Sequence, residues 1–504
     1  MKNNWWQRIF KTSSLIGLSK IIGFARDLLI ASYFGTSAAA DAFNFAYLFT
    51  GNIFILLGGL NGPFHSATVA TLSKITNSQK EQNIFLSQAL GAVFLFFTFL
   101  SFLLILFLQP ITALILPPET DLIMAFIKQS YLMLPLLALA GVIGVLFGAV
   151  SFKGDYFWPS LSPLISSLAL ILCLCLGYKI WGEWVLGFGT ALGAILQALI
   201  QFIDLSKYNF QFALALPIEK NQKDSLKYFF AILLPALLSS TIGSLNVYVD
   251  SFFTANLAKG SWTAILLGNR LIQLPFGILV GAGLISFLPR ISACKDDKPQ
   301  FENILNTEIN NLFFLMIPAT AILLALSEPI IKFLFERGQF TAESTNLVNL
   351  VLLGLAGSLL TALPREVFTR AFYALGDSKT PLIVSLVSII LNALFDWWLA
   401  GKFAVAGIAL STTLTSAFNS VLIVFLLQAK IKDLKITWLK ILPLLALGFL
   451  SSFVAKLVFT QISFFLQVFR FNAFLQLGLS LAVSVLAALV LYFGIALYLK
   501  KKIK

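Results

Sequence analysis

Long apolar stretches recur along the whole chain, and they restrict the possible folds more than any other feature of the sequence. Of 504 residues, 59% are hydrophobic and 11% are charged, whereas a soluble domain carries about 25% charged residues. Because a helix needs roughly 20 apolar residues to cross a bilayer, we predict an all-α membrane protein with about fourteen transmembrane helices. The predicted spans lie near residues 12–33, 39–61, 84–108, 127–150, 158–179, 184–205, 226–254, 260–288, 305–326, 345–372, 380–400, 403–428, 437–460 and 472–498.

The basic residues are distributed unevenly between the predicted loops. The formal net charge is +13, and the lysines gather in alternate loops and near both ends of the chain. Cytoplasmic loops typically carry such an excess, so we expect a multi-pass protein of the cytoplasmic (inner) membrane with both termini in the cytoplasm. This placement also argues against nucleic acid as a partner. The loops concerned carry Lys74, Lys80, Lys207, Lys223, Arg290, Lys295, Lys298, Lys430, Lys432, Lys435 and Lys440.

One short motif occurs twice. Residues 154–159 read Gly-Asp-Tyr-Phe-Trp-Pro after the fourth predicted span, and residues 376–381 read Gly-Asp-Ser-Lys-Thr-Pro after the tenth. Gly and Pro suit a helix stop and start, so the turns themselves have a structural explanation. Because transporters are often built from repeated halves, the repetition predicts two six-helix lobes in parallel repeat plus two C-terminal helices. We place the lobes at 1–210 and 211–430 and the additional helices at 431–504.

Three cationic side chains lie within predicted spans. Lys20 and Arg26 are in the first span, Arg270 is in the eighth, and the acids Asp27 and Asp41 lie close in sequence to the first pair. Charges at membrane depth are costly and usually functional. The arginine fork also donates paired hydrogen bonds to phosphate. We therefore predict that these five residues form a binding site for an anionic, phosphate-bearing head group.

Simpler interpretations of these charges remain open. Arg26 and Asp27 are also compatible with a snorkelling pair at a helix end. Arg270 is likewise compatible with a local pair to an acid such as Asp250, which would only lock two helices together. Pro275 and Gly277 follow Arg270 and predict a kinked or broken helix. Neighbouring helices or a cavity would then have to provide hydrogen bonds for the freed backbone groups.

A second group of polar residues predicts a site for a coupling ion. Asp250 is in the seventh span, Asn392 and Asp396 are one turn apart in the eleventh, and Thr412 is in the twelfth. Two carboxylates, an amide and a hydroxyl are hard oxygen donors, and they suit sodium, with protons as an alternative. In the competing interpretation, Asp396 merely marks the interfacial end of its helix, beside two tryptophans.

The segments that carry the cationic residues resemble the MurJ (MviN) family. The resemblance rests on residues 23–27 (Gly-Phe-Ala-Arg-Asp), 40–43 (Ala-Asp-Ala-Phe), 269–271 (Asn-Arg-Leu) and 338–341 (Gly-Gln-Phe-Thr), and it extends over nearly the whole chain. That family belongs to the multidrug/oligosaccharidyl-lipid/polysaccharide exporter superfamily. Its members flip lipid II, the undecaprenyl-pyrophosphate-linked peptidoglycan precursor.

The resemblance implies a lipid II flippase for cell wall biogenesis that works by alternating access. It also implies that Lys20, Arg26 and Arg270 line a cationic central cavity, and that the last two helices form a groove for the lipid tail. The sequence departs from the family pattern at two places. Lys20 stands where arginine is common, and residues 50–57 lack a pair of arginines found in the second helix of many members.

The remaining expectations concern chemistry and partners. The sequence contains no nucleotide-binding P-loop motif, and we expect no catalytic residues, no enzyme activity and no cofactor apart from the candidate sodium ion. The expected partners are lipid II and membrane lipids, with the protein acting as a monomer. The alternatives are a related exporter of another cargo, such as a polysaccharide-linked lipid or a drug, and, less favoured, a membrane glycosyltransferase.

Overall fold

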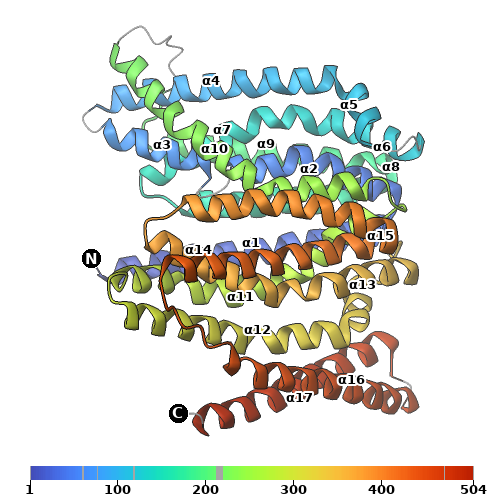
Figure 1. The fold of residues 1–504 in the computed structure, drawn as a ribbon. Helices are drawn as coiled ribbons and strands as arrows, with labels where there is room; N and C mark the ends of the chain where they lie inside the picture. Colours follow the sequence, from blue (N-terminus) through green and yellow to red (C-terminus); the bar gives the residue numbers. More distant parts are fainter. Residues whose placement is uncertain are drawn as a thin grey trace. The chain divides into compact units, whose positions relative to one another are not determined.

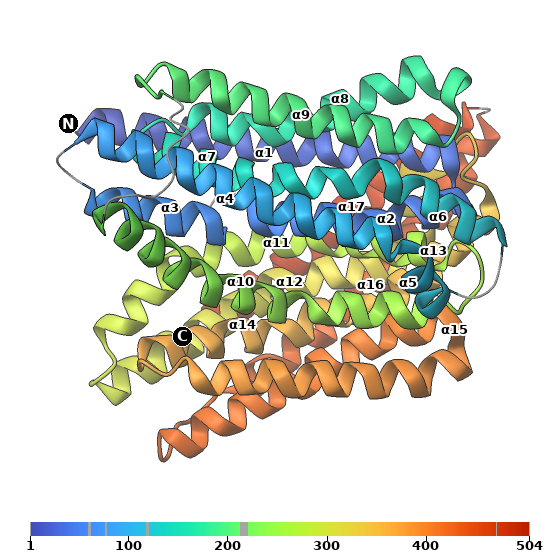
Figure 2. The ribbon, with the colours of Figure 1, turned by 90° about the horizontal axis from the view of Figure 1, so that it is seen from above.

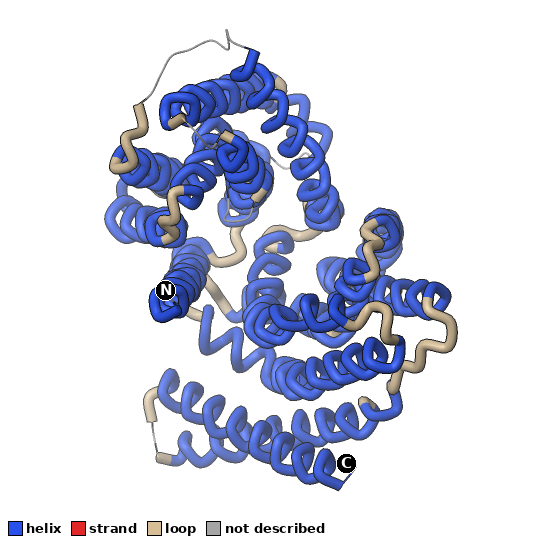
Figure 3. The backbone as a smooth tube through the Cα atoms, turned by 90° about the vertical axis from the view of Figure 1, so that its left-hand side faces the viewer, coloured by secondary structure: helices blue, strands red, loops and turns tan. Residues whose placement is uncertain are grey.

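The computed structural model is helical throughout the residues that it describes, and none of them forms a strand (Figure 3). This confirms the all-α fold class. The described residues are 2–58, 62–75, 78–116, 120–211, 220–469 and 471–502.

The chain forms two compact units, residues 1–248 and 249–504. Their boundary falls inside one long helix, α10, so this helix belongs mostly to the first unit and ends in the second. The predicted lobes, which end at residues 210 and 430, were inferred from a repeated motif and not from contacts between helices. That division therefore stays a prediction. The helices of the first unit, with α10, are α1 (Lys2–Phe34), α2 (Ala38–Gly58), α3 (Pro63–Lys74), α4 (Gln79–Leu106), α5 (Leu108–Ile115), α6 (Thr120–Met133), α7 (Leu137–Phe152), α8 (Phe157–Trp181), α9 (Trp184–Ser206) and α10 (Lys220–Thr254).

The second unit is also built from helices alone among its described residues. These are α11 (Ser261–Ala293), α12 (Lys298–Phe335), α13 (Ala342–Ala356), α14 (Ser358–Ala374), α15 (Lys379–Lys430), α16 (Leu442–Val468) and α17 (Ala473–Lys502).

Every predicted span coincides with one of these helices or with two helices in direct succession. Within the described residues, eleven helical stretches are long and apolar enough to cross a membrane, with α15 counted once. Helix α15 contains 52 residues but is not straight, because Ala404 has the non-helical angles φ 49° and ψ −131°. The predicted separation between 380–400 and 403–428 corresponds to this break.

Side-chain hydrogen bonds show that α15 folds back on itself at Ala404. Ser411 Oγ donates to the carbonyl of Asn392 at 3.2 Å, and Asn419 Nδ2 donates to Ser388 Oγ at 2.6 Å. From the first pair to the second, the residue after Ala404 advances from 411 to 419, whereas its partner before Ala404 goes back from 392 to 388. The two parts of α15 are therefore an antiparallel helical hairpin.

Of the two predicted outcomes at Pro275, a broken helix is wrong, and a kink stays a prediction. Helix α11 is continuous from Ser261 to Ala293 and includes both Pro275 and Pro289. Proline removes one hydrogen bond of the helix, but transmembrane helices tolerate it when local adjustments satisfy the freed carbonyl.

Within each unit, helices pack both against neighbours in sequence and against helices distant in the chain. In the first unit α1 packs against α8, and α8 packs along α9 (Figure 2). In the second unit α16 and α17 form an antiparallel pair that packs against α12 (Figure 1). The α16–α17 contact with α12 is close, since a Cβ added at Gly448 would lie 2.4 Å from Ile317 Cγ2. Helix α12 therefore connects the C-terminal pair to the rest of its unit.

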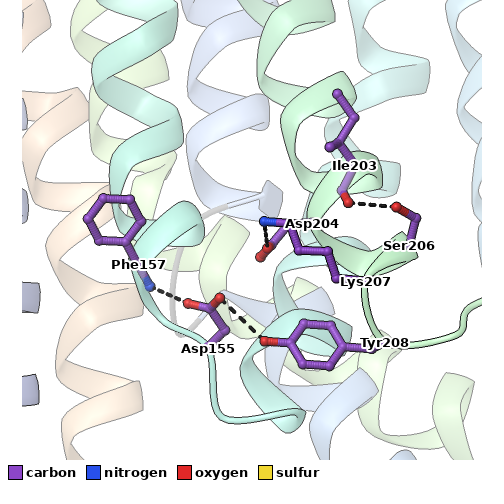
Figure 4. A network of polar contacts seen from close by, with 7 residues as sticks. All are labelled: Asp155, Phe157, Ile203, Asp204, Ser206, Lys207 and Tyr208. Carbon is purple, nitrogen blue, oxygen red and sulfur yellow. Dashed lines mark hydrogen bonds and ion pairs between the residues drawn. The ribbon is translucent and has the colours of Figure 1, made fainter.

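The repeated Gly-Asp turns fold alike in both units. Asp155 Oδ1 accepts a hydrogen bond from the backbone N–H of Phe157 at 2.8 Å, and its Oδ2 accepts one from the Tyr208 hydroxyl at 3.3 Å (Figure 4). The first bond caps the following helix. The second joins the turn to the residues after α9, 53 positions further along the chain.

Asp377 repeats this arrangement in the second unit. Its Oδ1 accepts from the Thr380 N–H at 3.0 Å, and its Oδ2 accepts from Lys430 Nζ at 2.6 Å, again across 53 positions. Each aspartate thus uses one oxygen to cap the following helix and the other to bind a residue at or just after the end of a later helix, 53 positions along the chain. The identical spacing supports the repeat that the motif predicts, although a phenol replaces the lysine in the first unit.

Asp377 is bound by a charged lysine and Asp155 by a neutral phenol. This difference is seen in the pKa values of Asp377 and Tyr208. The Lys430 ammonium group and the Thr380 hydrogen bonds hold the pKa of Asp377 far below its usual value. Burial, with the negative charges of Asp155 and Asp204, raises the pKa of Tyr208. The phenol therefore stays protonated and donates its hydrogen bond at neutral pH.

We predict that Asp377→Asn lowers Tm by several degrees and roughly twice as much as Asp155→Asn. Asparagine keeps the oxygen that caps the helix, so each variant tests only the contacts of the second oxygen, which in Asp377 also accepts from the Thr380 hydroxyl at 2.8 Å. Hydrogen bonds between charged groups are about twice as strong as neutral ones. The measurement is thermal unfolding of the purified protein in detergent at low and high salt.

The difference between the two variants should shrink at high salt and stay constant between pH 6 and pH 8. The folded-state pKa of Asp377 lies below its ordinary value of 3.8, so its stabilisation is complete well above that value and is lost only as the pH falls through the lowered pKa. Equal Tm losses for both variants, or a difference that titrates near neutral pH, would contradict this explanation.

Candidate functional site

The first unit holds an arginine within helix α1 by pairing it with its own neighbour. Arg26 Nη2 and Nε lie 2.7 and 3.0 Å from Asp27 Oδ1, and the two side chains are only 16% and 13% exposed. The pair lies well inside α1, which ends at Phe34, so it is not a snorkelling pair at a helix end. The Arg26 guanidinium also interacts with Tyr47 of α2, and it therefore links α1 to α2.

The other predicted residues of the first unit lie at different levels. Lys20 is exposed on α1, nearly two turns before Arg26. Asp41 is 4% exposed and lies in the first turn of α2, where a carboxylate favours the positive end of the helix dipole. It is six residues from Tyr47, or about 9 Å along the helix. The structure thus places Asp41 nearer the α1–α2 turn than Arg26.

Arg270 lies on the exposed side of α11 in the second unit. Its neighbours Leu271 and Ile272 are 4% and 7% exposed, and a Cβ added at Gly268 would lie 2.8 Å from Val351 Cγ1 of α13. One side of α11 is therefore packed against protein, and the arginine projects from another side.

The predicted ion-site residues of the second unit come together around one amide. Asn392 Nδ2 donates to Asp250 Oδ1 at 2.5 Å and to Asp396 Oδ2 at 3.1 Å. Asp250, Asn392 and Asp396 are 8%, 2% and 0% exposed. Asp396 is thus buried, and it does not merely mark an exposed helix end, although Trp397 and Trp398 beside it are 71% and 50% exposed.

Asp250 and Asp396 are two buried carboxylates that share the amide of Asn392, and they require a bound cation or a proton to offset their negative charge. Like charges in a low-dielectric interior repel strongly, and an unpaired buried charge costs several kcal/mol or more, as an order of magnitude. Asp396 Oδ1 is buried and has no hydrogen-bond partner among the described residues. The free oxygen and the hard donor set fit a small cation such as sodium.

The three hydroxyl residues of the neighbouring helix have different contacts. Ser411 is buried and donates to the Asn392 carbonyl at 3.2 Å. Thr412, the predicted ligand, donates to the Ile408 carbonyl of its own helix at 3.2 Å, and its oxygen keeps lone pairs that can bind a cation. Thr413 donates to Gly354 of α13 at 2.7 Å.

The sequence analysis did not identify two of these residues, Tyr47 and Ser411. Tyr47 is a polar aromatic residue within an apolar span, and that was its only signal. Ser411 precedes the predicted Thr412 directly. The rotation of one helix against another decides which hydroxyl faces Asn392, and spacing within a single helix does not give that rotation.

Comparisons with known proteins show the family of the chain. A family model described as Lipid II flippase MurJ matches residues 30–480. A probable lipid II flippase MurJ from Synechocystis sp. is 33% identical over 441 residues, which is 83% of this chain and 80% of that protein.

Two solved structures resemble the whole chain or most of it. The structure of a lipid II flippase MurJ in an inward closed conformation has a TM-score of 0.79 at 21% identity, covering 98% of this chain and 99% of that chain. An inward-facing multidrug resistance MATE family transporter of the MOP superfamily has a TM-score of 0.68 at 13% identity, covering 84% of this chain and 98% of that chain.

The fold is therefore that of a multi-pass helical membrane transporter, shared with MurJ and MATE proteins. Because the family model covers most of the chain and a relative above 30% identity supports it, the chain belongs to the lipid II flippase MurJ family.

Proposed function

We propose that this protein is a lipid II flippase, which moves the undecaprenyl-pyrophosphate-linked precursor across the cytoplasmic membrane for cell wall biogenesis. The observation that carries the proposal is the family match over residues 30–480. The arginine that Asp27 and Tyr47 hold inside α1 supports it, since a flippase for an anionic head group needs positive charge at membrane depth.

The physical task is to carry a polar head group past a hydrocarbon barrier while its tail stays in lipid. We propose that Lys20 and Arg26 of the first unit and Arg270 of the second each contribute positive charge to the pyrophosphate. Asp27 binds the Nε and Nη2 side of the Arg26 guanidinium, which leaves the rest of its five N–H donors for other acceptors. The pair also fixes the direction of the arginine, so less side-chain entropy is lost when the substrate binds.

Transport by alternating access requires no covalent chemistry, so we assign no catalytic residue and propose that the protein is not an enzyme. Lipid II and the surrounding lipids are the proposed partners, and one chain is the proposed functional unit. We propose an orientation with both termini in the cytoplasm, which the lysine-rich loops support.

The second-unit carboxylates are the proposed site for a coupling cation. Asp250 lies just past the unit boundary within α10, whereas Phe229 near the start of the same helix packs against Phe85 of α4 in the first unit. A cation bound by Asp250, Asn392 and Asp396 would fix the last turn of α10 to α15. Cation binding would thereby affect a helix that belongs to both units.

The first test uses cells depleted of the protein and complemented with variants. We expect Arg26→Ala and Arg270→Ala to lower the amount of lipid II exposed outside at least about tenfold, because losing a charged partner of a desolvated phosphate costs roughly 2–5 kcal/mol. Arg26→Lys keeps the charge but loses the fork, so it should retain partial activity. The measurement is cleavage of lipid II by a hydrolase added to intact cells.

Arg370→Ala is the matched control, since Arg370 pairs with Glu366 one turn away at 2.7 Å. It should support normal exposure at equal protein abundance. Normal exposure with both Arg26→Ala and Arg270→Ala would refute the proposed roles of these arginines.

The second test concerns the coupling cation. Sodium chloride should raise the Tm of the purified protein by a few degrees relative to choline chloride, because a ligand that binds only the folded state stabilises it. Asp396→Asn should abolish this response. Ser388→Ala removes a polar pair elsewhere in the same hairpin, so it should lower Tm in both salts and keep the sodium response. An equal sodium response in Asp396→Asn would rule out this site.

A further inference from the structure

The segment between α15 and α16 is bonded along its length to one side of α12. Four polar side chains on α12 recur every fourth residue, and so they share one helix face. They are Lys298, Glu302, Asn306 and Asn310. The linker, residues 431–441, includes a short 3₁₀ turn (Trp438–Lys440).

The hydrogen bonds between α12 and the linker follow the order of residues in both segments. Lys298 Nζ donates to the Lys432 carbonyl at 2.6 Å, and Glu302 Oε2 accepts from the Lys435 N–H at 3.2 Å. Asn306 Nδ2 donates to the Lys435 carbonyl at 2.8 Å. The linker backbone is therefore held at two successive levels of α12.

The same ladder continues at Thr437. Asn306 Oδ1 accepts from the Thr437 N–H at 2.8 Å and from its hydroxyl at 3.1 Å, and Asn310 Nδ2 donates to that hydroxyl at 3.4 Å. Leu434 and Ile441 are each 5% exposed and anchor the linker by their side chains. The linker is thus a structured part of the second unit.

The outward side chains of this fixed linker combine positive charge with apolar surface. We call them the linker face: Lys432, Lys435, Trp438, Leu439 and Lys440. All five are exposed, and Trp438 and Leu439 are 38% and 79% exposed.

The acidic residues around the linker are mostly engaged elsewhere. Asp377 binds Lys430, and Glu302 accepts from the linker backbone. Asp433 is the one acid within the linker. Three lysines against one aspartate leave the linker face with a net positive charge.

We propose that the linker face binds the phosphate groups of anionic phospholipids in the adjacent leaflet. Helix α16 begins at Leu442, one residue after the linker, so the face lies where a membrane helix meets the head groups. Tryptophan prefers that level, and clustered lysines beside a membrane helix attract anionic lipid. The bonded backbone holds the lysines and Trp438 exposed together within nine residues next to a membrane helix, which favours lipid over a soluble partner. Bound lipid would keep the α12–α16 junction at the membrane surface.

The test measures quenching of Trp438 by brominated lipids added to the full-length protein in detergent. The Trp438 signal is the difference between the wild-type protein and Trp438→Phe. Each lysine near an anionic surface contributes roughly fivefold in affinity. We therefore expect brominated phosphatidylglycerol to bind at least about tenfold more tightly than brominated phosphatidylcholine.

The triple variant Lys432→Gln, Lys435→Gln, Lys440→Gln should lose this preference, and the corresponding lysine-to-arginine triple should retain it. A control triple with the same charge change, Lys80→Gln, Lys223→Gln, Lys227→Gln, alters exposed residues of the first unit and should also retain it. A preference that survives the linker triple, or that the control triple abolishes equally, would overturn the proposal. Absence of any preference in the wild-type protein would overturn it as well.

Discussion

An arginine held by an ion pair within helix α1 is the constraint on which the functional interpretation depends. An isolated charge at membrane depth would snorkel to the surface or deform the bilayer. Asp27 neutralises Arg26 at 2.7 Å and Tyr47 adds a second contact, so both alternatives are avoided if α1 spans the bilayer as the sequence predicts. The protein would then keep a polar, hydrogen-bonding group at membrane depth. Such a group has little value for folding alone, and it suits a transporter of an anionic head group.

The two units share a repeated turn and differ in their buried charges. Asp155 and Asp377 each cap a helix and fasten a residue 53 positions later. The first unit holds a partly buried arginine paired with its aspartate, whereas the second buries Asp250 and Asp396 around one amide. Two units that share this turn thus differ in the charges that they hold. We associate the cationic one with substrate and the acidic one with a coupling cation.

Hydropathy was sufficient to predict the helices, because bilayer thickness sets their length and apolar character. The reversal near Ala404 was also predictable, since the apolar pattern restarts there. The predicted alternative of a broken helix at Pro275 was wrong, because a membrane helix can continue through proline. Asp250, Asn392 and Asp396 were found because buried carboxylates are rare in apolar spans. Ser411 and Tyr47 were not, since their roles depend on how helices rotate against each other, which one helix's own sequence does not show.

Transport of lipid II by the purified protein is the central claim, and reconstitution measures it most directly. Labelled lipid II would be placed in both leaflets of liposomes, and an external hydrolase would cleave whatever reaches the outer leaflet. Liposomes without protein should stop near half cleavage. With the wild-type protein, cleavage should proceed towards completion, whereas protein carrying both Arg26→Ala and Arg270→Ala should behave like empty liposomes. Wild-type protein that leaves the inner half uncleaved, with a sodium gradient or membrane potential of either sign applied, would contradict the account.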